Sequence, residues 1–503
     1  MNSLKKNIGW TTILSIAGFI LSFASQIIIS YFFGTSAELD SYWVAFALMN
    51  LLAFPLASLK EALVPGVHQH GQSDPRNASV YFSQGMSLVI LVAVIGMIAA
   101  WVFGPRLSAL IIGDSPSSTI EVLVMRQLHW LAPGIVLLAI SETLGALLTS
   151  FHKVIFQMIS RVLAASTSLI CIGIFSGWIG INAISIGFLS GQLVMSFVLI
   201  FVFLKLKIVF KPRWPGDLGR DYFYLTFNLL VSALAAQLYV LYERAVFADF
   251  GTGIISSFQY GVSLTNVVIA ILAGSLASVF WPRFMAYVQQ DDFSSLYKEV
   301  ALAIKISLIA LGGVCSFAYL CASPIVSIIF VRGAFNQEAA LRTAEMLQAT
   351  IFTALPIAII TLVGRVLISL KSSKAIMLVG LSIAISGAIT LRLAYQIESI
   401  NLAIHHWVVA NIIGCIVSAL VFGRVIKLRF SDYLSDAWWV GRFIISLTMM
   451  MVLWGLFGAP LHIESLGLIG LFIMALAYGF LYLFIAWGAR LLPPMKIGIL
   501  KIK

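Results

Sequence analysis

The sequence predicts an all-α polytopic membrane protein with about fourteen transmembrane helices. Of its 503 residues, 61% are hydrophobic and 10% are charged, and the mean hydropathy is +1.03. Soluble domains are roughly 45–50% apolar and about 25% charged, and a soluble chain this apolar would expose patches that aggregate. The apolar runs are also too long, and alternate too little, for the strands of a membrane barrel.

Each predicted span is a mostly apolar run of roughly 20 residues, because a helix of that length crosses about 30 Å of hydrocarbon. In chain order the spans are expected at 8–32, 40–66, 79–104, 128–150, 156–177, 181–204, 222–248, 256–281, 299–322, 346–370, 374–392, 400–423, 438–458 and 465–489. An even number of spans places both termini on the same side of the membrane.

Basic residues are concentrated in alternate connections between these spans. One side collects most of them, including Lys205, Lys211 and Arg213, whereas the other side holds few. The positive-inside rule therefore predicts cytoplasmic N- and C-termini. The formal net charge of +11 reflects this topology, and we expect no nucleic-acid partner.

The two halves of the chain repeat a short pattern. Phe-Gly-Thr at Gly34 recurs at Gly251, an offset of 217 residues, and a proline follows each glycine by 31 residues, at Pro65 and Pro282. An offset of six spans preserves the orientation in the membrane, so the repeat is parallel. In transporters with such repeats the substrate site lies between two lobes that rock against each other.

The repeat predicts four segments. They are an N-lobe at 1–205, a basic cytoplasmic linker at 206–221, a C-lobe at 222–427, and a C-terminal helix pair with a basic tail at 428–503.

Several charged residues lie within predicted spans, where each costs a few kcal/mol unless it faces a polar cavity or another charge. They are Lys60, Glu61, Glu142, Glu243, Arg244 and Arg365. Glu142 and Arg365 each follow a proline by nine residues, so they occupy equivalent positions in the two lobes. Two interpretations stay open: a cross-lobe ion pair that forms in one state only, or an Arg365 guanidinium that holds a substrate phosphate. Static pairing for assembly is the simpler alternative, and Lys305 is expected to reach the membrane interface.

The sequence contains no pattern typical of an enzyme or a metal protein. It has no Gly-rich loop with GK[ST], no GxSxG and no Cys or His residues at metal-binding spacing. The cysteines Cys171, Cys315, Cys321 and Cys415 lie within or at the ends of spans and are expected to be small buried hydrophobes. We therefore expect a transporter without a cofactor.

Two segments resemble a known family. Residues 32–52 read FFGTSAELDSYWVAFALMNLL and are followed by ALVP at 62–65, and residues 330–347 read FVRGAFNQEAALRTAEML. These segments resemble the MurJ/MviN lipid II flippase family of the multidrug/oligosaccharidyl-lipid/polysaccharide exporter (MOP) superfamily. The resemblance implies two six-helix lobes in a V, a cationic cavity, and two C-terminal helices with a groove for a lipid tail.

The resemblance also implies a function. Members flip an undecaprenyl-pyrophosphate-linked saccharide, which is lipid II or an exopolysaccharide or O-antigen repeat unit, from the inner to the outer leaflet for cell-envelope synthesis. Implied partners are this lipid-linked oligosaccharide, membrane lipid, H+ or Na+ as a coupling ion, and cell-envelope biosynthesis enzymes. The alternative within the superfamily is a cation-coupled multidrug exporter.

The chain departs from the family where arginines are usual. Ser25, Ala53 and Ser263 occupy three such positions, which favours a divergent member that moves a saccharide other than lipid II.

The resemblance and the charge pattern together define the candidate site. Candidates for substrate binding in the cavity are Lys60, Arg244, Arg365, Ser25 and Ser263, and candidates for gating or ion pairing are Asp40, Glu61, Glu142 and Glu243.

Overall fold

A computed structural model describes most of the chain. The described residues are 2–73, 75–112, 118–151, 153–205, 209–214, 216, 218–370, 372–427, 430–457 and 467–491. Parts of the predicted linker (206–208, 215 and 217) and the predicted tail at 492–503 lie outside them.

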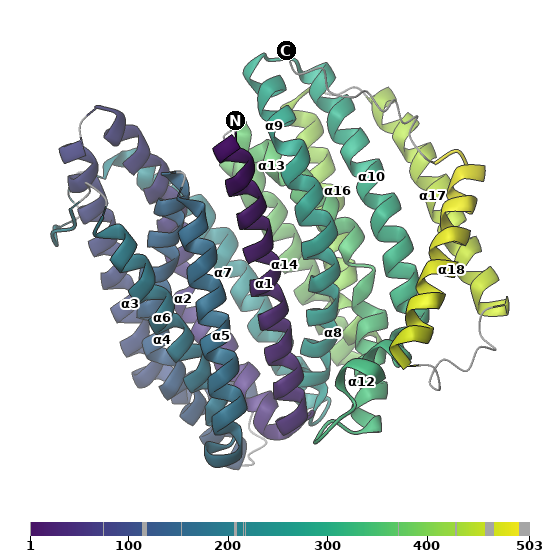
Figure 1. Ribbon diagram of the computed structural model, residues 1–503, viewed down its shortest axis with the longest axis horizontal. Coiled ribbons are helices and arrows are strands. Elements are labelled where there is room, and N and C mark those ends of the chain that lie inside the picture. The colour runs from purple at the N-terminus through teal and green to yellow at the C-terminus, as the bar shows by residue number, and fades with distance from the viewer. Residues whose placement is uncertain are drawn as a thin grey trace. The chain divides into compact units, whose positions relative to one another are not determined.

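The described residues form helices almost throughout (Figure 1). Thirteen of these helices are long and apolar enough to cross a membrane, and a bent pair of helices brings the number of candidate spans to fourteen. The prediction of an all-α polytopic membrane protein is thus confirmed.

Contacts divide the chain into two compact units. Unit 1 comprises Met1–Ser256 and Phe330–Ala339, and unit 2 comprises Ser257–Ile329 and Ala340–Lys503. These boundaries are defined by contacts alone, so the division into lobes at the 206–221 linker stays a prediction.

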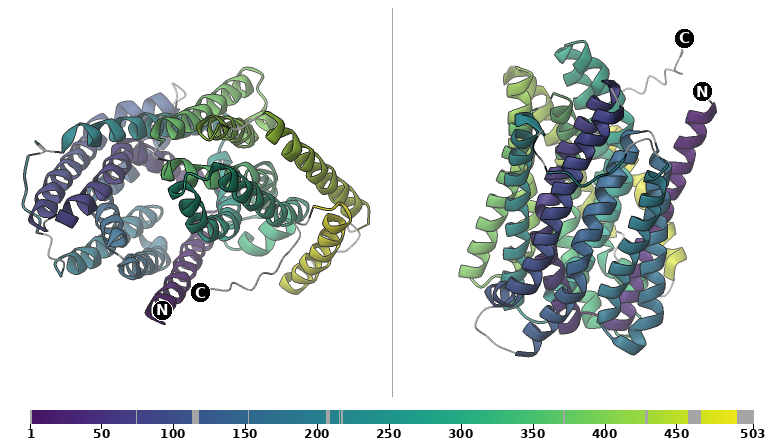
Figure 2. Two further views of the ribbon diagram at one scale, coloured as in Figure 1. Left: turned by 90° about the horizontal axis from the view of Figure 1, so that it is seen from above. Right: turned by 90° about the vertical axis from the view of Figure 1, so that its left-hand side faces the viewer.

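The helices of unit 1 run roughly along one common direction (Figures 1 and 2). Its helices are α1 (Asn2–Phe33), α2 (Ala37–Ser73), α3 (Pro75–Ile112), α4 (Ser118–Ser150), α5 (Val154–Ile179), α6 (Asn182–Phe203) and α7 (Gly219–Asp249). Helix α2 packs against α3, α4 and α7, whereas α1 packs along α5, which also contacts α6. Leu39, Leu48 and Leu63 of α2 are fully buried, so this helix forms the centre of the unit 1 core.

The two segments that resemble the family lie next to each other in unit 1. Gly34 ends α1 with a φ of +54°, and a Cβ there would lie 2.5 Å from the Ala334 carbonyl oxygen. The Ala334 N–H donates to the Tyr31 carbonyl at 2.8 Å. Glycine at Gly34 is therefore required both by the left-handed turn and by the close approach of the 330–339 segment.

Unit 2 contains the remaining helices. They are α8 (Ile254–Val268, whose first three residues belong to unit 1), the π-helical turn η1 (Ile269–Gly274), α9 (Ser275–Gln289), α10 (Phe293–Leu320), α11 (Ala322–Phe330, whose last residue belongs to unit 1), α12 (Gln337–Ile351, whose first three residues belong to unit 1), α13 (Ala354–Ser369), α14 (Ser373–Gln396), α15 (Ile400–Ile404), α16 (His406–Val425), α17 (Phe430–Phe457) and α18 (Gly467–Gly488). A core of residues from α9, α10, α13, α14 and α16 holds one part of this unit together.

The predicted single span at 346–370 is broken in the structure. Helices α12 and α13 meet there at 42°. Pro356, in the first turn of α13, has no N–H and cannot donate to the carbonyl of Phe352, which instead accepts from Leu355 at 3.2 Å. The predicted span therefore corresponds to a bent pair of helices that begins at Gln337 rather than to one continuous helix.

Helices α17 and α18 pack against α10 where α10 has two adjacent glycines. A Cβ on Gly312 would lie 2.7 Å from the Phe443 ring, and one on Gly313 would lie 2.8 Å from the Tyr482 ring. The Tyr482 hydroxyl donates to the Ile309 carbonyl at 2.8 Å, and the Tyr478 hydroxyl donates to Ser316 at 2.6 Å. The glycines thus allow the aromatic side chains to approach the α10 backbone.

Candidate functional site

One carboxylate in unit 1 contacts two cations. Glu142 of α4 accepts from the Lys60 ammonium of α2 at 3.1 Å, and its other oxygen lies 3.7 Å from the Arg161 guanidinium of α5. The Lys60, Glu142 and Arg161 side chains are 17%, 34% and 48% exposed. This cluster carries a net charge of +1, so it remains positive after the internal pairing.

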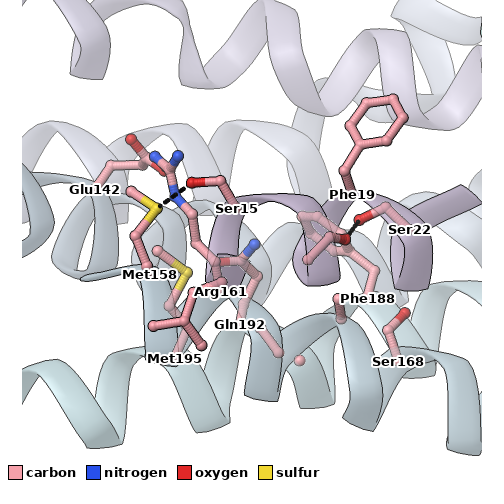
Figure 3. Close-up of a pocket in the computed structure, with 15 residues that line it drawn as sticks. Ser15, Phe19, Ser22, Glu142, Met158, Arg161, Ser168, Phe188, Gln192 and Met195 are labelled. Atoms are coloured by element: carbon pink, nitrogen blue, oxygen red, sulfur yellow. Dashed lines mark hydrogen bonds and ion pairs between the residues drawn. The ribbon is translucent and has the colours of Figure 1, made fainter. Parts of the chain in front are cut away.

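Two cavities meet at this cluster. A small one of about 160 Å³ is lined by α2, α4 and α7, including Asn50, Lys60 and Gln237. A larger one of about 480 Å³, which we call the α1–α5 pocket, is lined by residues of α1, α4, α5 and α6. Glu142 lines both cavities, whereas Arg161 lines only the α1–α5 pocket (Figure 3).

A second charged group of unit 1 is largely buried. The Arg244 guanidinium lies 3.4 Å from the carboxylate of the preceding Glu243, and their side chains are 8% and 7% exposed. Because both charges are removed from solvent, they stabilise each other, and the pair supplies little net charge to a ligand.

Asp40 caps the N-terminus of α8. Its two carboxylate oxygens accept from the backbone N–H groups of Gly253 at 2.5 Å and Ser256 at 2.8 Å. The first backbone N–H groups of a helix have no partner within the helix, and a carboxylate there also interacts favourably with the helix dipole. The observed contacts of Asp40 therefore stabilise the start of α8, and all of them lie within unit 1.

Arg365 in unit 2 stacks on an aromatic ring. Its guanidinium lies 4.1 Å from the ring centroid of Trp281, which joins α13 to α9. Among the residues that the structure describes, no carboxylate lies within ion-pair distance of Arg365. A stacked guanidinium keeps its N–H groups at the edge of the plane, where they can bind the oxygens of a phosphate.

The remaining candidates do not join these groups. Ser25 and Ser263 donate to carbonyls of their own helices, Leu21 at 3.1 Å and Tyr260 at 2.7 Å. Glu61 is exposed and forms no ion pair with another described residue. The adjacent Lys60 and Glu61 side chains therefore have different environments.

Lys305 of α10 contacts a carboxylate of α17. Its ammonium lies 2.6 Å from Asp436 of α17, and the same carboxylate accepts from the Tyr297 hydroxyl of α10 at 2.5 Å. Lys305 therefore helps to attach α17 to α10, and its position relative to the membrane interface stays a prediction.

Sequence reasoning missed Arg161 and Trp281 as site residues. Arg161 is not among the charged residues selected above, although it lies inside the predicted span at 156–177. That position is the signal that could have identified it. Trp281 had no comparable signal, because its contact with Arg365 joins residues far apart in the sequence.

The described residues hold no group of three His, Cys, Asp or Glu side chains that could bind a metal ion. The four cysteines are free thiols, and Cys315 and Cys321 are buried.

An apolar groove lies between α10 and α18 in unit 2. Its volume is about 620 Å³, and it is lined by residues such as Ile309, Phe317 and Leu483, together with the ring of Tyr482.

Comparison with solved structures shows that the fold is shared with known membrane transporters. A lipid II flippase MurJ in an inward closed conformation matches with a TM-score of 0.76 over 95% of this chain and 98% of that chain, at 19% sequence identity. An inward-facing multidrug resistance MATE family transporter of the MOP superfamily matches with a TM-score of 0.68 over 82% of this chain and 94% of that chain, at 14% identity. At these identities the likeness concerns the fold.

Sequence comparison points to one family. A probable lipid II flippase MurJ of Treponema pallidum is 24% identical over 73% of this chain and 71% of its own length. A second, from Rickettsia prowazekii, is 24% identical over 64% of this chain, and the match spans 64% of that relative. The model of the family described as lipid II flippase MurJ matches residues 29–472. The chain therefore belongs to the lipid II flippase MurJ family and is a multi-pass membrane transport protein rather than an enzyme.

Proposed function

We propose that this protein flips an undecaprenyl-diphosphate-linked saccharide from the inner to the outer leaflet by alternating access, for the synthesis of a cell-envelope polymer. The observation that carries the proposal is the family match over residues 29–472 of the 503-residue chain. Lipid-linked saccharides combine a diphosphate with a long apolar chain. The protein should therefore offer both a cation and an apolar surface.

Arg365 is the cation that best supports this proposal. Lys60 and Arg244 both contact carboxylates, whereas the Arg365 guanidinium stacks on Trp281 and has no ion-pair partner among the described residues. In a low-dielectric environment, a fixed guanidinium stabilises phosphate charge more strongly than it would in water. We assign Arg365 to the diphosphate and Trp281 to the orientation of its guanidinium.

The groove between α10 and α18 supports the apolar part of the proposal. Its lining is almost entirely hydrocarbon and aromatic, which suits an isoprenoid chain. The resemblance implies a groove for a lipid tail along the last two spans, and α18, the last of them, forms one wall of this groove.

The substrate charge also bears on the energy source. A diphosphate is negative, so a membrane potential that is negative inside favours its outward movement by about 2.3 kcal/mol per elementary charge per 100 mV. Outward movement of the headgroup is movement from the inner to the outer leaflet. A gradient of H+ or Na+ is the alternative source.

Complementation tests the proposal. The gene is expressed in bacteria depleted of their own lipid II flippase, and it is also deleted in its native host. Rescue from lysis identifies lipid II as the substrate, and loss of a surface polysaccharide on deletion identifies a repeat unit. If deletion leaves every envelope polymer normal and produces only drug sensitivity, the proposal is wrong and a multidrug exporter is favoured.

Whichever of these phenotypes appears, the variant Arg365→Gln tests whether Arg365 contributes to the activity behind it. We expect activity to fall at least about tenfold at unchanged protein levels, because a hydrogen bond to a charged phosphate is lost. The control is Arg392→Gln, which removes another unit 2 arginine that lies over an aromatic ring, Tyr395, at 5.9 Å. Equal activity of the two variants would remove Arg365 from the site.

A further inference from the structure

The α1–α5 pocket has a charged end and an uncharged end. Figure 3 shows Arg161 and Glu142 with Ser15 and Met158 at one end, and Phe19 and Phe188 with Ser22 and Ser168 at the other. Small residues make the space between them: Gly18, Ala164, Ala165 and Gly191 all line the pocket. The pocket is therefore amphipathic along its length.

The charged end lies closer to the α4–α5 connection than the other end does. Arg161 follows the start of α5 by seven residues, and Glu142 precedes the end of the α4 span at Thr149 by seven residues. At about 1.5 Å per residue, both lie roughly 10 Å inside the helix ends. Ser168, at the other end, lies about 21 Å from the start of α5.

Charge complementarity identifies the kind of ligand. The Lys60–Glu142–Arg161 cluster has a surplus of one positive charge. Arg161 is the more exposed of the two cations, and its contact with Glu142, at 3.7 Å, is longer than a hydrogen bond. One anionic group beside Arg161 would balance the cluster and use the guanidinium donors that face the pocket.

We propose that the α1–α5 pocket binds one anionic phospholipid, with its phosphate on Arg161 and an acyl chain between Phe19 and Phe188. Basic pockets between transmembrane helices on the cytoplasmic side commonly hold anionic lipid headgroups. The pocket volume of about 480 Å³ accommodates a headgroup and the first part of one chain, not a whole lipid. All residues of this site belong to unit 1, whereas Arg365 belongs to unit 2.

Native mass spectrometry of the full-length protein in detergent tests this site, with dioleoylphosphatidylglycerol as the probe and dioleoylphosphatidylcholine as the neutral comparison. We expect one tight site for phosphatidylglycerol in the wild type. Arg161→Gln should weaken that site about tenfold, because it removes a charge-assisted hydrogen bond. Arg220→Gln, which removes an exposed arginine at the start of α7, should bind like the wild type.

A second variant separates lipid binding from folding. Ala165→Leu fills the pocket and leaves the Lys60–Glu142–Arg161 cluster intact, so it should also lose the tight site. Wild-type affinity in Arg161→Gln, or equal affinity for phosphatidylcholine, would overturn the proposal. Displacement of the lipid by millimolar inorganic phosphate, together with unchanged binding in Ala165→Leu, would assign the site to a soluble ion instead. None of these results depends on whether the protein flips a saccharide.

Discussion

At the scale of single residues, Glu142 determines the charge balance of the unit 1 cluster. Glu142→Gln would leave Lys60 and Arg161 without a carboxylate and raise the cluster charge from +1 to +2. A fully buried pair costs more to break than an exposed one. For this partly exposed pair we expect a loss of about 1–3 kcal/mol of stability, measured by thermal unfolding in detergent.

Two further variants make this prediction specific. Lys60→Gln leaves Glu142 paired with Arg161, so it should destabilise less, and the double variant Lys60→Gln/Glu142→Gln should recover part of the loss because the net charge returns to +1. Glu61→Gln is the control, since Glu61 is exposed. If Glu142→Gln and Glu61→Gln unfold at the same temperature, the cluster contributes nothing to stability.

Sequence reasoning found the charged residues but not their partners. Lys60, Glu142 and Arg365 stand out because charges are rare within apolar runs. Lys60 and Glu142 are 82 positions apart, however, and only the packing of α2 against α4 brings them together. The suggested pairing of Glu142 with Arg365 stays a prediction. Within unit 1, Glu142 contacts Lys60 and Arg161, and within unit 2, Arg365 contacts Trp281.

At the scale of helices, Asp40 joins α2 to the start of α8. Asp40→Ala would leave the N–H groups of Gly253 and Ser256 without their side-chain acceptor. Losing such a cap typically costs about 1–2 kcal/mol. We expect faster amide hydrogen exchange in the peptide around residues 250–260, measured by mass spectrometry.

The matched control for this cap is Glu38→Ala. Glu38 is an exposed acidic residue in the same first turn of α2, and exchange around 250–260 should stay at the wild-type rate in that variant. Asp40→Asn should be intermediate, because an amide oxygen can still accept one hydrogen bond. Unchanged exchange in Asp40→Ala would show that the cap does not hold α8 in place.

The positions of the helices could be predicted from the sequence because long apolar runs determine them. The breaks within helices could not be predicted in this way. The span at 346–370 looked continuous, yet Pro356 interrupts its hydrogen bonds and α12 begins earlier, at Gln337. Residues 337–345 include three charged side chains, Glu338, Arg342 and Glu345. A search for apolar runs therefore misses the first part of α12.

At the scale of the whole molecule, composition determined the fold class and short motifs determined the family. The turn at Gly34 and the 330–339 segment, which both resemble the family, contact each other in unit 1. This contact explains why the two segments that resemble the family occur together in one chain. The substrate does not follow in the same way, because Ser25 and Ser263 stand where the family usually has arginine and donate only to their own helices.

The most direct measurement is translocation in vesicles that contain only this protein and a fluorescent undecaprenyl-diphosphate-linked saccharide. A membrane-impermeant reagent then destroys the label in the outer leaflet. We predict that the protected fraction of the label falls faster with the wild type than in protein-free vesicles or with Arg365→Gln, and faster still under a potential that drives the anion outward. A wild-type rate equal to that of protein-free vesicles, in protein that is folded and correctly inserted, would contradict the account.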